Sequence, residues 1–163
     1  MTKKIFITLL LGIIIPLSAI FLWLKSTPNI IVTPEQALID EPVEILISNL
    51  PANEQIIIEA SCKDKDNNAW TSHATFQTDD KGVVNVAKQA PISGSYSGVD
   101  PMGLVWSIAP ADKEVLQRTG ALNTYEIELS VFSKDKLLAK KIIHRLPVSP
   151  DVERKEIRED GIV

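Results

Sequence analysis

The chain has 163 residues, of which 45% are hydrophobic and 23% are charged, and its formal net charge at pH 7 is −4. This length suits one domain with a sizeable core, and the presence of one cysteine excludes an intramolecular disulfide. After Lys25, 14 Lys and Arg stand against 21 Asp and Glu, a net charge of −7, so nucleic acid and anionic lipid head groups are poor partners.

An uncharged apolar run, IFITLLLGIIIPLSAIFLWL, occupies residues 5–24 behind Lys3 and Lys4. As a helix it would span about 30 Å, the thickness of a bilayer core. A cleaved signal should end in a small-x-small site, but the residues after Ala19 stay bulky. We therefore predict a signal anchor at residues 1–25, with a cleaved signal peptide as the alternative. The two lysines favour the inner side of the membrane. The rest is then extracytoplasmic, on a single-pass membrane protein or, after cleavage, secreted or periplasmic.

From Ile30 onward the hydrophobic pattern has a period of two. Apolar residues alternate with polar ones in four segments, which predicts half-buried antiparallel strands. The residues expected to face the core are Val43, Ile45 and Ile47; Ile56, Ile58, Ala60 and Cys62; Trp70, Ser72, Ala74 and Phe76; and Tyr125, Ile127, Leu129 and Val131.

Turn signals rich in Pro, Asn, Asp and Gly separate these segments at 50–53, 64–68, 79–82 and 133–136. Only residues 111–119 could form a helical turn or two. The pattern predicts an all-β, immunoglobulin-like sandwich of seven or eight strands over residues 26–149. Residues 150–163 are charged and predict a linker or tail.

The stretch SGSYSGVDPMGLVWSIAP, residues 93–110, concentrates glycine, proline and large side chains. We interpret it as a structured crossover that enters a short apolar strand from Leu104 to Ile108. Its large side chains, Tyr96, Met102 and Trp106, are expected to anchor it to the core. A binding surface for a lipid or acyl chain is the alternative.

This stretch resembles the N-terminal domain of acyl-CoA thioesterases and bile acid-CoA:amino acid N-acyltransferases. Segments at 40–45, 49–51, 70–76, 79–83 and 154–159, together with Arg145, extend the resemblance from about Thr33 to Glu159. The residues that carry the family signature, which we expect to be structural, are Trp70, Gly94, Tyr96, Gly98, Asp100, Pro101, Met102, Gly103 and Trp106.

In that family the resemblance implies a following α/β-hydrolase-type domain with the nucleophile, aspartate and histidine, whereas the sequence here stops at Val163. We therefore expect a non-catalytic module that packs against a hydrolase domain or another membrane protein. The alternatives are the N-terminal fragment of a split or truncated thioester hydrolase or acyltransferase, and an independent ligand-binding sandwich.

Three motifs could suggest chemistry, and each has a simpler explanation. Gly94 to Gly98 imitates a nucleophile elbow, but Tyr96 holds the serine position. Cys62, His73 and His144 could form a cysteine–histidine site only if folding brought them together. Asp64, Asp66 and Asn68 imitate a calcium loop without its glycine and glutamate. We predict no catalytic residue, no metal site and no cofactor.

Overall fold

A computed structural model of the chain describes residues 27–112, 114–115 and 125–153. Within these ranges the fold is all-β, with ten strands and one helical turn. The strands are β1 (Asn29–Thr33), β2 (Gln36–Leu38), β3 (Glu44–Ser48), β4 (Gln55–Lys63), β5 (Ala69–Gln77), β6 (Val84–Asn85), β7 (Ser93–Gly94), β8 (Ala109–Pro110), β9 (Tyr125–Ser133) and β10 (Lys136–Leu146), and the helical turn is α2 (Gly103–Trp106).

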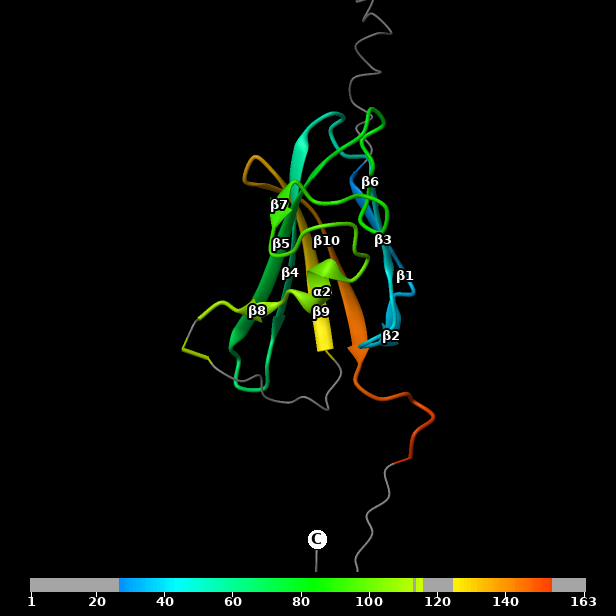
Figure 1. Ribbon diagram of the computed structural model, residues 1–163, viewed down its shortest axis with the longest axis vertical. Helices are drawn as coiled ribbons and strands as arrows, with labels where there is room; N and C mark the ends of the chain where they lie inside the picture. The colour runs from blue at the N-terminus through cyan, green and yellow to red at the C-terminus, as the bar shows by residue number, and fades with distance from the viewer. Residues whose placement is uncertain (1–26, 113, 116–124, 154–163) are drawn as a thin grey trace, which may run out of the picture.

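The strands form two sheets, which lie face to face in Figure 1. The smaller has the order β1-β3-β6, and the larger has the order β2-β10-β9-β4-β5-β7, with β8 also paired to β5. All pairs are antiparallel except β2 with β10. The prediction of seven or eight strands was too low, because β6, β7 and β8 have only two residues each and leave no periodic pattern.

Alternate residues of the long strands fill the space between the sheets, as their period of two predicts. Ile45 of β3, Ile58 of β4 and Leu129 of β9 are fully buried and belong to one core cluster. The strand faces predicted from the sequence are thereby confirmed. Because both sheets contribute to a single core, the arrangement is that of a two-layer sandwich.

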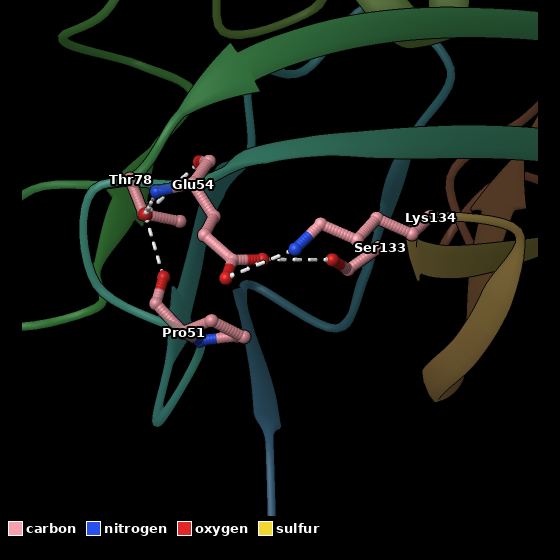
Figure 2. A network of polar contacts seen from close by, with 5 residues as sticks. All are labelled: Pro51, Glu54, Thr78, Ser133 and Lys134. Atoms are coloured by element: carbon pink, nitrogen blue, oxygen red, sulfur yellow. Dashed lines mark hydrogen bonds and ion pairs between the residues drawn. The ribbon is translucent and has the colours of Figure 1, made fainter.

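Polar contacts join the β3–β4 turn to two other segments at one end of the sandwich (Figure 2). The Thr78 hydroxyl is buried, donates to the Pro51 carbonyl at 2.7 Å, and accepts the Glu54 amide at 2.9 Å. The Glu54 carboxylate reaches the β9–β10 hairpin, where it accepts from Ser133 at 3.2 Å and pairs with Lys134 at 3.3 Å. This network holds the ends of four strands together.

Several expectations fall partly or wholly outside the described ranges. The apolar run at residues 5–24 lies outside them, and within them no helix is long and apolar enough to cross a bilayer. The predicted domain limits at 25 and 149 and the charged tail stay predictions. Of residues 111–119, the described part forms a turn in which the Glu114 amide donates to Asp112 Oδ1 at 2.9 Å.

The predicted strand from Leu104 to Ile108 is wrong. Residues 103–106 form α2, in which the Trp106 amide donates to the Met102 carbonyl at 2.9 Å. The Ser107 hydroxyl then closes the turn on the Gly103 carbonyl at 2.6 Å. A five-residue apolar run has no periodicity that separates strand from helix, so these local hydrogen bonds decide the conformation.

Candidate functional site

The signature segment forms an arch on the edge of β5, and we use "the arch" for residues 93–110. Its first end, β7, pairs with Ala74 and Thr75. Its second end, β8, pairs with Trp70 and Thr71. Between these two contacts the chain leaves the edge of the sheet, makes the α2 turn and returns (Figure 1).

The middle of the arch packs into the core of the sandwich. Leu104 is fully buried and Met102 is 3% exposed. The buried Ser72 hydroxyl of β5 donates to the Leu104 carbonyl at 2.5 Å, and Asp100 Oδ1 accepts the Met102 amide at 2.8 Å. Through these contacts Asp100 and Met102 help to hold the arch against the core. Pro101, between them, is half-buried.

Tyr96 packs on the backbone of the arch, and this explains Gly103. A Cβ atom at position 103 would lie 2.2 Å from Tyr96 Cε2, so only glycine leaves room for the ring. Burial of the phenol, with a smaller effect of the nearby Asp100 charge, raises the pKa of Tyr96 to about 12. The phenol is therefore neutral at physiological pH and unsuited to act as a base.

The two other signature glycines differ in what surrounds them. A Cβ atom on Gly94 would lie 2.4 Å from the His73 carbonyl oxygen, because β7 approaches the backbone of β5 closely. Gly98 has φ of +80° but no atom within 4 Å of such a Cβ. Gly94 is thus required by close approach, and Gly98 by its backbone angle alone.

The expectation that Trp106 anchors the arch to the core is wrong. Its side chain is 55% exposed, while Leu104 two positions earlier is buried. Residues two apart on a helix point to nearly opposite sides, so α2 cannot bury both. Trp106 is therefore a large apolar side chain on the surface of the signature segment.

The structure does not bring together the cysteine and histidine considered as a catalytic pair. Cys62 faces the core at 7% exposure, whereas His73 lies on the exposed face of β5. His144 is on β10, with its Nδ1 4.0 Å from Glu126 Oε1. The contact missed from the sequence is between Ser95 Oγ and His73 Nδ1, 3.4 Å apart, which depends on the register of β7.

The Asp64 loop is accounted for by hydrogen bonds. Burial acts to raise the pKa of Asp64, but hydrogen bonds from Asn68, Trp70 and Asp66 outweigh it and lower the pKa to about 2. The carboxylate thereby organises the β4–β5 turn and holds the Trp70 indole at 3.3 Å. Within the described ranges, no group of three or more His, Cys, Asp or Glu could hold a metal ion.

Comparison with known proteins places these features in a family. The model of the "Acyl-CoA thioester hydrolase/BAAT N-terminal region" matches residues 40–159, which include the whole arch. The chain belongs to this family.

Individual relatives agree with this assignment. Acyl-coenzyme A amino acid N-acyltransferase 1 of Mus musculus is 32% identical over 82% of this chain and 35% of its own length. Bile acid-CoA:amino acid N-acyltransferase of Homo sapiens is 28% identical over 78% of this chain and 33% of its own length. Acyl-coenzyme A thioesterase 2, mitochondrial, of Mus musculus is 26% identical over 86% of this chain and 32% of its own length. The chain spans about a third of the length of these relatives.

In this member of the acyl-CoA thioester hydrolase/BAAT N-terminal family, the described contacts of the arch are mostly those of a structural element. In this member Gly94, Tyr96 and Gly103 fix the path of the backbone. Asp100 and Met102 seat it on the core. Trp106 is the exposed aromatic side chain of the described arch, at 55%, and Val99 of the same segment is exposed at 56%.

Proposed function

We propose that this chain is a non-catalytic β-sandwich module that packs against a catalytic hydrolase domain or partner. The observation that carries the proposal is the extent of the family match. The family model matches residues 40–159, and the match to a mouse acyltransferase covers 82% of this chain but only 35% of that enzyme, so the likeness is to one region of a longer enzyme. We propose in addition that the sandwich is of the immunoglobulin-like class.

Exposure of Trp106 supports a docking role for the arch. Tryptophan is enriched among the few residues that dominate binding energy at protein interfaces. Here it is 55% exposed on a segment that is otherwise held rigidly by β5 and the core. A rigid segment with an outward aromatic side chain loses little conformational entropy on binding.

A chimera tests the proposal. Residues 40–159 would replace the matching region of the mouse acyl-coenzyme A amino acid N-acyltransferase 1, and acyl transfer would be measured. We expect a folded, active chimera, and a loss of activity on deletion of the grafted region. Trp106→Ala in the graft should weaken the domain contact, whereas Val99→Ala, at another exposed position, is the matched control. A folded chimera in which the grafted module and the hydrolase domain do not associate would contradict the proposal.

We also propose that residues 5–24 tether the module to a membrane. Support comes from the length and hydrophobicity of this run and from the lysines before it. Membrane fractionation at alkaline pH, with intact-mass measurement of the extracted protein, tests it. Retention of the uncleaved chain in the membrane pellet is expected. Recovery of a shortened chain in the soluble fraction would favour the cleaved signal.

An independent extracytoplasmic ligand-binding sandwich is a second candidate. The outward position of Trp106 favours it, because a lone docking aromatic can serve a small ligand as well as a protein. A chain that binds a small ligand but fails to support the chimera would select this candidate.

A further inference from the structure

An open groove lies at the end of the sandwich where the described chain begins. Its volume is about 760 Å³, and it lies between the residues that lead into β1, the β3–β4 turn and the β9–β10 hairpin. Its apolar walls are Pro28, Leu50, Pro51 and Leu138. Segments far apart in the sequence therefore meet around one space, which is large enough for a small molecule or for the head group of a lipid.

The charged side chains that line this groove in the described structure are both cations, Lys134 and Lys136. Lys134 pairs with Glu54 at 3.3 Å, but its side chain is 81% exposed and an ammonium group has three donors. Lys136 is exposed and makes no ion pair within the described ranges. Glu54 and the hairpin residue Asp135 are not among the described lining residues. The groove thus combines apolar walls with exposed positive charge.

The groove lies next to the point at which the proposed membrane tether joins the sandwich. Thr27 lines it, and the Thr27 carbonyl accepts from Asn49 Nδ2 at 3.2 Å. Only Lys25 and Ser26 separate Thr27 from the apolar run at residues 5–24, a reach of about 10 Å at most. β10 ends at the opposite end of the sandwich (Figure 1). A chain tethered through that run would therefore present the groove, and not the far end, to the lipid head groups.

We propose that this groove binds the head group of an anionic phospholipid, with the phosphate at Lys134 and Lys136 and the glycerol part against the apolar walls. The inference rests on the proposed membrane tether. The net charge of −7 after Lys25 opposes a general attraction to an anionic surface, so the contact has to be local. A zwitterionic head group brings a cation of its own beside the two lysines and fits less well. A soluble phosphate ester carries the same charge but lacks the high local concentration that a tether gives to membrane lipids.

The charge of Lys136 is the feature most open to test. Lys136→Gln should raise the fraction of anionic lipid at half-saturation by about fivefold, the usual effect of one lysine at a membrane surface. Lys136→Arg keeps the charge and should keep the response. Lys81→Gln is the matched control. It removes the same charge from an exposed position at the same end, where the Gly82 carbonyl accepts the Leu50 amide at 3.0 Å, but Lys81 does not line the groove.

NMR spectra of the full 163-residue chain in lipid nanodiscs test the proposal, with the amides of Leu50, Ser133 and Leu138 as local probes. Nanodiscs of phosphatidylcholine receive increasing fractions of phosphatidylglycerol. The three amide signals should shift saturably, and the amide of Leu146, at the far end of β10, should not. Glycerol 3-phosphate added at the same total concentration to nanodiscs of phosphatidylcholine alone should leave all four signals in place.

A saturable response that is weakened in Lys136→Gln and kept in Lys136→Arg and Lys81→Gln supports the site. The proposal is overturned if the groove amides do not respond, if Lys81→Gln weakens the response as much as Lys136→Gln, or if glycerol 3-phosphate gives the same shifts. A chain that does not enter the nanodiscs rejects the tether and this site together. A chain that enters them without a response in the groove rejects this site alone.

Discussion

Replacement of Gly94 by alanine tests the structural role of the arch most sharply. The added Cβ would lie 2.4 Å from the His73 carbonyl oxygen and 2.7 Å from Ala74 Cα, both atoms of the β5 backbone. Relief requires β7 to move away from β5. That movement weakens the hydrogen bonds from the Ile92 amide to Thr75 and from the Ser95 amide to His73, each 2.8 Å long.

The expected loss of stability in Gly94→Ala follows from these contacts. Two backbone hydrogen bonds at about 1 kcal/mol each, with about 1–2 kcal/mol of backbone strain, give a loss of roughly 3 kcal/mol in the free energy of unfolding. Gly98→Ala is the matched control, because its φ is also positive at +80° but its Cβ would meet no atom within 4 Å. Strain of about 1–2 kcal/mol there is partly offset by a less flexible unfolded chain, which leaves roughly 1 kcal/mol.

Urea unfolding of the purified chain, followed by circular dichroism, measures both variants. We expect Gly94→Ala to lower the midpoint clearly more than Gly98→Ala, at an unchanged slope. Equal losses, or a larger loss in Gly98→Ala, would refute the argument that close approach to β5 requires glycine at position 94.

Three further predictions concern single side chains. Leu104→Ala should lower the free energy of unfolding by about 2–5 kcal/mol, because Leu104 is fully buried. Trp106→Ala should change it by less than about 1 kcal/mol, because Trp106 is exposed. Equal losses of stability in chemical unfolding would contradict the orientation of α2. The pKa of Asp64 is lowered from 3.8 to about 2, so the ionised carboxylate stabilises the folded chain fully above about pH 4, and this stabilisation is lost as the pH falls toward 2. The unfolding midpoint of Asp64→Ala should therefore decline less over that pH range than the midpoint of the unmodified chain. An identical decline in both would count against the turn network. Thr78→Val leaves the Glu54 amide without its acceptor and should lower stability by about 1–3 kcal/mol in thermal unfolding, with no change as the opposing result.

The long strands of the fold could be predicted because their side chains obey one rule. Ile56, Ile58 and Leu129 alternate with polar residues and are buried in the structure. Such alternation is a local property of the sequence. The same holds for the faces of Cys62 and His73, which the pattern placed on opposite sides and the structure confirms.

The arch was harder to predict because its conformation depends on contacts that are distant in sequence. Ser72 and Leu104 are 32 positions apart, yet their hydrogen bond helps to fix the α2 turn. Exposure of Trp106 follows from that turn, whereas a strand over residues 104–108 would place Trp106 on the same face as the buried Leu104. The buried guanidinium of Arg145 also has no local sequence signal, since its partner Glu41 is 104 positions away.

The measurement that tests the central claim most directly is thioester hydrolysis by the purified 163-residue chain. The account of a non-catalytic module predicts a rate with a medium-chain acyl-CoA that equals the rate without protein, in the unmodified chain and in Ser95→Ala and Cys62→Ala alike. Turnover that exceeds the blank and is abolished by either substitution would contradict it. Such a result would place a nucleophile in the β-sandwich itself.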